Sequence, residues 1–188
     1  MSNREPIEIF TSIDCEFNQP SGKIIEIGYV IGNIRTGEIL HENSIFVNPL
    51  EEISQYITDL TSITQNDVVN AVLLPEAYEV LKADHLKYKS FVNPITWGSG
   101  DTKAIKDELG MKDDYVFGRR WLDVKTVWVT FRLAHGKPIQ GGLAKSMTKL
   151  ALRFEGKKHR AIDDSRATFQ FYCKLCEMMR EIKTYVRN

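Results

Sequence analysis

The sequence predicts an α/β fold built on a mixed central sheet. Three β-rich runs joined by short turns come first, and strands alternate with segments of helical periodicity after Pro49. Short connections favour an antiparallel meander, whereas strands separated by helices pair in parallel. The chain of 188 residues contains no internal repeat and no linker rich in proline or glycine, so we expect one domain over residues 1–188.

The first three strands are predicted over residues 7–17, 23–34 and 38–47. In the first, side chains alternate between an apolar face that includes Ile9 and Ile13 and a second face that carries Asp14 and Glu16. The next two runs are β-rich, and Gly37 in the turn between them suits a positive φ.

Helices and further strands follow in turn. Apolar residues at helical spacing predict a helix over residues 67–87 that restarts at Pro75, and the apolar run 91–97 predicts a buried strand. Asp101 opens a helix that ends before Gly110, a residue suited to the left-handed position after a helix. The remaining predictions are a strand or extended segment over 115–124 and helices near 124–134, 143–153 and 162–184.

The composition excludes a globally basic surface. Lys and Arg total 25, and so do Asp and Glu, so any surface that binds a polyanion has to be local. The N-terminus lacks the pattern of a secretory signal peptide, and no apolar stretch approaches the ~18 residues that span a bilayer. Cys15, Cys173 and Cys176 form no zinc-ligand pattern, and we expect a cytoplasmic protein with reduced cysteines.

Acidic residues stand at the ends of predicted strands. Asp14 and Glu16 are two apart on a strand, so their side chains leave the same face near its C-terminal edge. An exposed pair of this kind is more often solvated surface than a ligand pair. Asp101 follows Gly98-Ser99-Gly100 at a helix start, where a carboxylate also stabilises the helix by ~1 kcal/mol without any further function.

The C-terminal helix separates two adjacent acids. Asp163 falls on its polar side, whereas Asp164 falls on an apolar stripe formed by Ala167, Phe171, Leu175, Met178 and Ile182. A carboxylate on a buried stripe is costly unless it is paired or bound to a metal. We therefore expect Asp164 to be a ligand and Asp163 to be a surface residue, with His159 in the preceding loop, close to Asp164.

Convergence of these acids would require a counter-charge. Two carboxylates 4 Å apart repel each other by about 4 kcal/mol at an effective dielectric constant of 20. A fold keeps such a cluster when a divalent cation neutralises it. The acids therefore either bind metal or do not meet.

The order and spacing of these residues resemble one known family. D-x-E in SIDCEF, an aspartate after a strand in WGSGD, and H-x-x-x-x-D in HRAIDD form the pattern of the DEDDh 3′→5′ exonucleases, which are DnaQ-like. The resemblance covers nearly the whole chain and includes KIIEIGYV, FVNPL and LTSIT. WGSGD and GLAKSMTKLALRFEGKKHRAIDDS look most like the Eri-type exoribonuclease branch. The implied fold is ribonuclease H-like, a three-layer α/β/α arrangement with a mixed five-stranded sheet.

The resemblance also implies roles for the residues. Asp14, Glu16, Asp101 and Asp164 would hold two Mg²⁺ or Mn²⁺ ions, which prefer hard oxygen ligands. His159 would take a proton from the attacking water, a task suited to imidazole at neutral pH. The implied reaction hydrolyses the terminal phosphodiester at the 3′ end of single-stranded RNA or DNA and releases nucleoside 5′-monophosphates.

Substrate contacts are expected from two loops. Many relatives carry Thr or Ala directly after the glutamate of D-x-E, where this chain has Phe17 followed by Asn18. Phe17 either stacks on the terminal base or continues the apolar face of its strand. Thr61 and Ile63 lie in a loop that the family places against the terminal nucleotide, with Ser62 where relatives often have glycine. Charge runs are often ordinary solvated surface; the candidate phosphate contacts are Lys103, Arg119, Arg120, Lys157, Lys158 and Arg160.

Two other interpretations are weaker. A haloacid dehalogenase-type phosphatase needs D-x-D-x-T/V, which Glu16 and Phe17 do not supply. A catalytically inactive nucleic-acid-binding or regulatory domain of the same fold is the main alternative, although the presence of all five catalytic-type residues argues against it. The expectation of RNA over DNA rests on likeness to the exoribonuclease branch, because no single residue evidently reads a 2′-hydroxyl.

Overall fold

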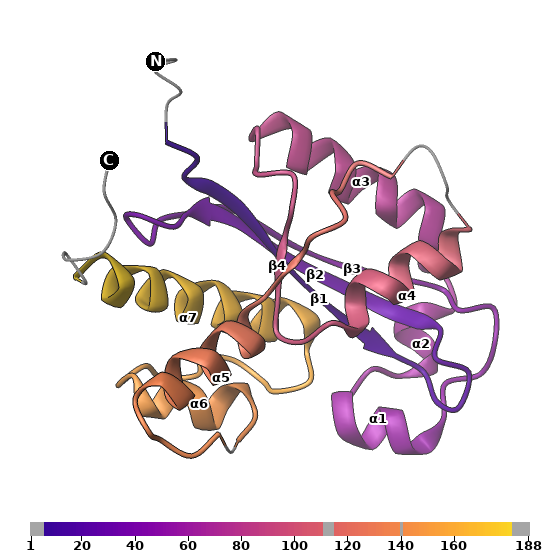
Figure 1. The fold of residues 1–188 in the computed structure, drawn as a ribbon. Helices are drawn as coiled ribbons and strands as arrows, with labels where there is room; N and C mark the ends of the chain where they lie inside the picture. Colours follow the sequence, from indigo (N-terminus) through magenta and orange to yellow (C-terminus); the bar gives the residue numbers. More distant parts are fainter. Residues whose placement is uncertain (1–5, 111–114, 140, 182–188) are drawn as a thin grey trace.

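A mixed five-stranded sheet forms the centre of the molecule (Figure 1). The computed structural model describes residues 6–110, 115–139 and 141–181. Its strands are β1 (Ile9–Phe17), β2 (Ile24–Asn33), β3 (Ile39–Phe46), β4 (Ile95–Thr96) and β5 (Leu122–Asp123). They lie in the order β3-β2-β1-β4-β5, with β1 to β3 antiparallel and β4 and β5 parallel to β1. The predicted meander and mixed sheet are confirmed.

Helices cover both faces of this sheet. They are α1 (Gln55–Thr61), α2 (Gln65–Val68), α3 (Leu74–Lys87), α4 (Gly100–Leu109), α5 (Val124–Ala134), α6 (Leu143–Lys149) and α7 (Ala161–Glu181). Figure 1 shows α3 and α4 on one side of the sheet and α5, α6 and α7 on the other. The predicted three-layer arrangement is confirmed. None of the helices in the described ranges is both long enough and apolar enough to cross a bilayer.

The alternation along β1 divides the core in two. Ile13 is fully buried in a first core cluster with Tyr78 of α3 and Ile105 of α4. Phe10 faces the opposite way and belongs to a second core cluster with Trp128 of α5 and Phe171 of α7. A strand buried on both faces has to alternate in this way, because successive side chains point to opposite sides.

Several predicted elements differ from those observed. The helix predicted over 67–87 is interrupted because Val72 forms a parallel bridge with Val47, so α3 begins at Leu74 with a proline in its first turn. The predicted strands over 91–97 and 115–124 contain only two paired residues each. α6 ends at Lys149 rather than at residue 153, and Ala151 has a positive φ of 56°. Helix α1 was not predicted, and positions 182–184 lie outside the described residues.

Helix α7 packs directly on the backbone of β2. A Cβ atom added at Gly28 would lie 2.1 Å from the carbonyl carbon of Ala161, and one at Gly32 would lie 2.4 Å from the ring of Phe169. Both distances are far below van der Waals contact. The two glycines therefore let the helix approach the sheet more closely than any side chain would allow.

The substitution Gly28→Ala should destabilise the protein, because the added methyl group has to push the first turn of α7 away from β2. Overpacking of this kind costs roughly 1–3 kcal/mol of unfolding free energy. Urea unfolding measures the loss. Gly100→Ala is the matched control, since a Cβ there meets nothing within 4 Å. Equal stability of the two variants would show that α7 does not pack this closely on β2.

Candidate active site

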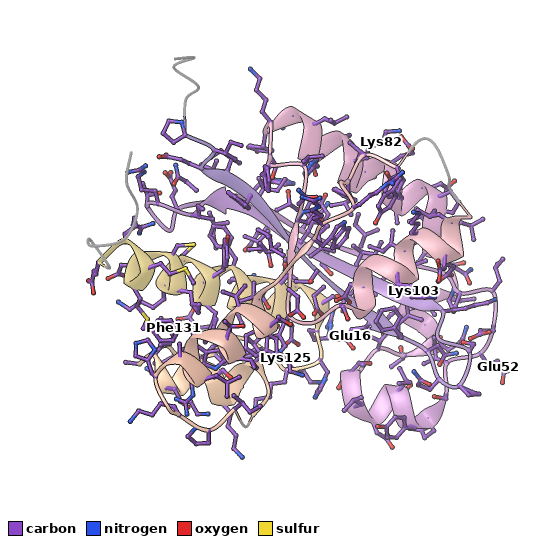
Figure 2. All side chains as sticks on the ribbon, in the orientation of Figure 1. Glu16, Glu52, Lys82, Lys103, Lys125 and Phe131 are labelled. Carbon is purple, nitrogen blue, oxygen red and sulfur yellow. The ribbon has the colours of Figure 1, made fainter. Side chains whose placement is uncertain are left out.

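Three acidic side chains meet where β1 ends and α7 begins. One carboxylate oxygen from each of Asp14, Glu16 and Asp164 lies within 4.8 Å of the others. Asp14 and Glu16 leave the same face of β1, and Figure 2 shows Glu16 between α4 and the first turn of α7. Asp14 pairs across the sheet with Gly28, so the close approach of α7 at this glycine brings Asp164 to Asp14. No second group of this kind occurs among the residues that the structure describes.

Asp101 lies beside this group on α4. It is 7% exposed, and its Oδ1 accepts a hydrogen bond from the backbone N–H of Cys15 at 3.1 Å. The carboxylate is thereby held against β1, between the positions of Asp14 and Glu16 in the sequence. A simple capping role does not describe it, because the N-cap residue of α4 is Ser99.

Burial and mutual repulsion raise the pKa values of these carboxyls. The pKa of Asp14 is well above its ordinary value, first because of burial and then because of the charges of Asp101 and Asp164. Burial raises the pKa of Glu16 to about 8, and nearby acids add to the rise. The pKa of Asp101 is raised by burial to about 6, and burial also raises the pKa of Asp164. A charge of the opposite sign would favour ionisation of all four groups.

The donor set fits a hard divalent cation. The side chains offer carboxylate oxygens, which are the ligands that Mg²⁺ and Mn²⁺ prefer. Burial and the charges of neighbouring acids disfavour the ionised carboxylates, and a bound cation would offset both effects. The cluster can therefore bind a divalent cation through Asp14, Glu16 and Asp164, with Asp101 alongside.

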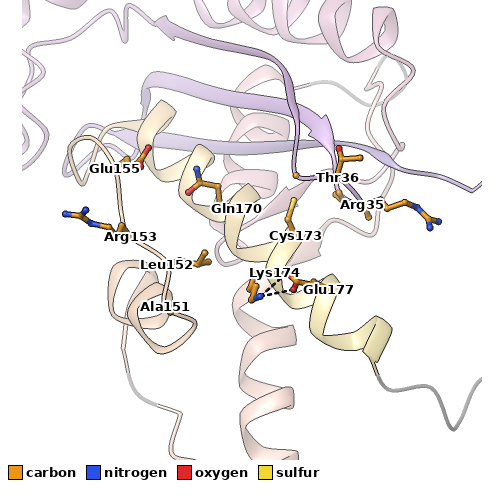
Figure 3. Close-up of a pocket in the computed structure, with 12 residues that line it drawn as sticks. Arg35, Thr36, Ala151, Leu152, Arg153, Glu155, Gln170, Cys173, Lys174 and Glu177 are labelled. Carbon is orange, nitrogen blue, oxygen red and sulfur yellow. Dashed lines mark hydrogen bonds and ion pairs between the residues drawn. The ribbon is translucent and has the colours of Figure 1, made fainter.

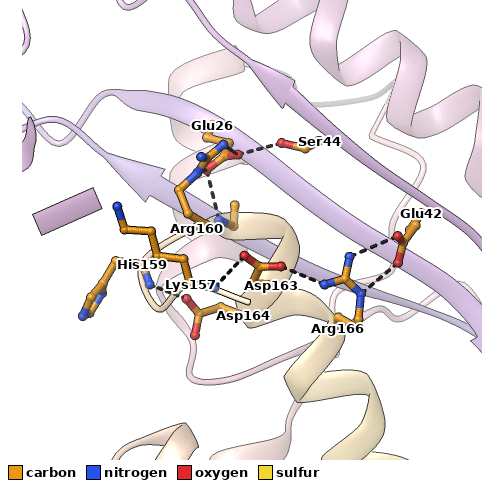
Figure 4. A network of polar contacts seen from close by, with 10 residues as sticks. Glu26, Glu42, Ser44, Lys157, His159, Arg160, Asp163, Asp164 and Arg166 are labelled. Atoms are coloured by element: carbon orange, nitrogen blue, oxygen red, sulfur yellow. Dashed lines mark hydrogen bonds and ion pairs between the residues drawn. The ribbon is translucent and has the colours of Figure 1, made fainter. Parts of the chain in front are cut away.

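His159 lies in the loop before α7 and has a positive φ of 61°. Its backbone N–H donates to Asp164 Oδ2 at 2.7 Å, while its imidazole is exposed and directed away from that carboxylate (Figure 4). A cavity of about 370 Å³ lies beside this loop. It is lined by His159, Asp164, Lys158, Leu143 and neighbouring residues. The imidazole thus borders a space that one of the clustered acids also reaches. Its role as a base stays a prediction.

Asp163 is not the surface residue that the helical phase predicted. Its carboxylate is mostly buried and accepts hydrogen bonds from the backbone N–H of Lys157 at 2.9 Å and from Arg166 at 2.7 Å. Arg166 in turn forms a bidentate pair with Glu42 on β3. The chain before α7 folds back over Asp163, and the phase of a helix carries no information about such a loop. The phase did place Asp164 correctly, on the face of Ala167 and Phe171.

Glu26 on β2 is a site residue that the sequence analysis missed. Its side chain is fully buried, and it pairs with Arg160, directly after His159. The available signal was an acidic residue inside the otherwise apolar run IIEIGYVI. An acid in such a strand has to find a partner.

The predicted substrate contacts are mostly buried. The side-chain amide of Asn18 donates to Glu51 and to the carbonyl of Glu52, and Thr61 donates to a carbonyl within α1. Ile63 is fully buried in a small core with Ile25, Ile57 and Val68. The side chains of Asn18, Thr61 and Ile63 are therefore buried, and a contact of these loops with a nucleotide stays a prediction that would have to use their backbone. Phe17 packs against the first core cluster and is only partly buried, so its contact stays a prediction.

The predicted phosphate contacts differ in what they touch. Arg160 is paired with Glu26, Lys103 with Asp107, and the Lys157 ammonium donates to Ser62 Oγ in the turn after α1. Arg119 lines a cavity of about 370 Å³ with Lys103, Lys106 and Trp121. Arg120 and Lys158 are exposed.

Another cavity, of about 470 Å³, lies toward the C-terminal part of α7 (Figure 3). Cys173 and Gln170 line it together with the turn between β2 and β3, and Lys174 there is paired with Glu177. None of the four acids lines this cavity. It is therefore separate from the candidate active site.

Comparison with known proteins identifies the family. A family model described as exonuclease, of the RNase T type, matches residues 11–172, which contain all four acids and His159. The chain belongs to this exonuclease family. It is 28% identical to mouse 3′-5′ exoribonuclease 1 over 166 residues, and 26% identical to the 3′-5′ exonuclease Snipper of Drosophila melanogaster over 178 residues. Each alignment covers 81% of this chain, but the chain spans only 47% and 60% of those proteins.

The solved structures confirm the ribonuclease H-like fold. The nuclease domain of 3′hExo, a DEDDh family member bound to rAMP, superposes with a TM-score of 0.80. The match covers 92% of this chain and 93% of that domain at 22% sequence identity. The resemblance to the DEDDh exonucleases that the motifs predicted is confirmed.

The stability of this exonuclease-family chain without metal should fall as the pH rises. Because the pKa of Glu16 is about 8 in the folded state and 4.5 otherwise, the folded state keeps a proton that the unfolded chain loses between these values. At about 1.4 kcal/mol per pKa unit, the loss by pH 8.5 is on the order of a few kcal/mol. Thermal unfolding in EDTA at pH 6 and pH 8.5 measures it.

Glu16→Gln is the control for this experiment. The variant should lose less stability than the wild type between the two pH values, and Mn²⁺ at pH 8.5 should raise its unfolding temperature less. Identical pH profiles of the two proteins in EDTA would contradict the electrostatic description of the cluster.

Proposed function

We propose that this chain is a divalent-metal-dependent 3′→5′ exonuclease that acts on single-stranded RNA. The observation that supports this most directly is the convergence of Asp14, Glu16 and Asp164, with Asp101 beside them, in a chain of the exonuclease family. Acids from β1, α4 and α7 come together at the C-terminal end of β1. The C-terminal ends of strands are where α/β folds usually place their sites.

In this proposal the four acids hold two Mg²⁺ or Mn²⁺ ions. When bound, two such ions would supply the means to activate a water and to stabilise the charge on the departing 3′ oxygen. The chain contributes the ligand geometry: β1 presents Asp14 and Glu16 together, and the N–H of Cys15 orients the Asp101 carboxylate. The ligand form of each acid is its ionised form, so metal binding should strengthen as the pH rises.

His159 is proposed as the general base. Its imidazole borders the cavity that Asp164 lines, and a ring nitrogen there can accept the proton of the attacking water. The N–H of His159 is bound to Asp164, so the loop that carries the base is tied to one of the metal ligands. A change in the position of Asp164 would therefore also move the base.

The proposed substrate is a 3′ end of single-stranded RNA. One mouse relative is named 3′-5′ exoribonuclease 1, another is named ERI1 exoribonuclease 2, and the superposed nuclease domain was solved with rAMP. The cavity of about 370 Å³ beside His159 is within the size range of small-ligand sites. Lys158 on its rim offers a positive charge to a phosphate.

A single assay tests the activity. Purified protein with Mn²⁺ should release labelled mononucleotide from a single-stranded RNA labelled at its 3′ end, and EDTA should stop the release. Asp14→Asn should lower the rate by more than about a hundredfold, because it removes one of the clustered ligands. The control Glu79→Gln changes an exposed acid on α3 and should keep the wild-type rate. If wild-type protein binds Mn²⁺ but leaves the RNA intact, the chain is better described as a catalytically inactive binding domain. If it degrades a matched DNA strand faster than the RNA, the proposed preference for RNA is wrong.

The substitution His159→Ala tests the general base. The loss of a positioned base costs about 10²- to 10⁴-fold in turnover. Binding of Mn²⁺ should change little, because the metal ligands and the backbone N–H of residue 159 both remain. Wild-type turnover of this variant would remove His159 from the mechanism.

A further inference from the structure

Glu26 is a fully buried carboxylate with four hydrogen-bond donors around it. It accepts from Arg160 Nε at 3.1 Å and Nη2 at 2.9 Å, from the backbone N–H of Ala161 at 3.0 Å, and from Ser44 Oγ at 2.6 Å. Figure 4 shows this network beside the loop that carries His159. The donors come from β3, from the end of the loop and from the first residue of α7.

A buried ion pair of this kind is a poor device for stability alone. Apolar residues of similar volume often stabilise a core as well or better, whereas a buried pair fixes a specific geometry. The groups fixed here are the two residues that follow His159. The position of Glu26 therefore affects the loop that carries the proposed base more than it affects the core.

The loop before α7 is irregular, and near its beginning Leu152 and Phe154 pack against the second core cluster. Residues 151–160 form no helix or strand, and His159 has a left-handed backbone that non-glycine residues rarely adopt. Two of its N–H groups are bound by acids of α7: that of Lys157 by Asp163 and that of His159 by Asp164. Glu26 supplies an anchor from the sheet, through Arg160.

Glu26 also lies next to the acid cluster. It is the cross-strand partner of Glu16 on the antiparallel pair β1–β2, and Glu16 is one of the clustered acids. Side chains at directly opposed positions lie on the same face of a sheet. Arg160 therefore places a positive charge beside two neighbouring acids, one in the cluster and one behind it.

We propose that Glu26 and Arg160 are positioning residues: together they hold the His159 loop against β2, beside the strand β1 that carries Asp14 and Glu16. The proposal rests on the proposed function, in which His159 acts on the substrate. Neither residue touches the substrate in this arrangement. In this proposal Arg160 does not bind a phosphate of the substrate, because its guanidinium is already bound to Glu26.

Glu26→Gln and Arg160→Lys test the proposal. Each keeps a polar group but breaks the two-point contact between guanidinium and carboxylate. Turnover on the single-stranded RNA should fall at least tenfold while KM changes less than twofold. A phosphate contact by Arg160 would instead raise KM, and that result would overturn the assignment. Glu8→Gln is the matched control, since it removes the exposed ion pair with Arg35 elsewhere on the same sheet and should leave both constants unchanged.

A spectroscopic measurement separates this proposal from the proposed function. The chain has four histidines, so the His159 imidazole can be assigned by NMR in isotope-labelled, metal-free protein by comparison with His159→Ala. Its signal should shift or broaden in Glu26→Gln and Arg160→Lys but not in Glu8→Gln. Should Glu26→Gln fail to fold, Arg160→Lys, which keeps the charge balance, decides. Wild-type turnover and an unchanged signal in the folded variants would refute the positioning role, whereas an inactive wild type with a shifted signal would refute only the proposed reaction.

Discussion

The direct contact between α7 and the backbone of β2 is the constraint on which the rest of the site depends. Gly28 stands opposite Asp14 in the sheet and leaves no side chain between the strand and the helix. The first turn of α7 consequently reaches the end of β1, and Asp164 meets acids that are about 150 positions away in the sequence. A sheet with any larger residue at this position would hold the helix farther out, and the three carboxylates would no longer share one point.

The contact between α7 and β2 brings acidic side chains together in a largely buried site. Four acids with raised pKa values surround the end of β1, and a fifth, Glu26, lies behind them. Among the described residues, the basic side chains form ion pairs with the acids around the cluster and not with those inside it. Arg160 neutralises Glu26, and Arg166 bridges Asp163 to Glu42, so the acids outside the cluster are paired while those inside it are not. Acids that lack a basic partner and lie close together are the arrangement that the proposed cation site requires.

The parts of this site that follow from local periodicity were predictable from the sequence. Alternation along β1 put Asp14 and Glu16 on one face, and the phase of α7 directed Asp164 toward them, although it wrongly placed Asp163 at the surface. Contacts between distant segments were not predictable. Nothing local indicates that Glu26 binds Arg160, which is 134 residues away, or that a loop folds over Asp163. For the same reason the short strands β4 and β5 were predicted too long, because their paired length depends on neighbours in the sheet and not on their own apolar residues.

The order in which the site residues occur along the chain has a consequence for biosynthesis. The acids of the site come from the first strand, from the middle of the chain and from the beginning of its last described helix. A ribosome therefore completes the β1–β3 meander long before Asp164 emerges. Until then, Asp14 and Glu16 have no partner from α7, and the nascent polypeptide holds an incomplete set of oxygen donors. The cluster can therefore form only after α7 has been synthesised and has docked on the glycine-lined face of β2.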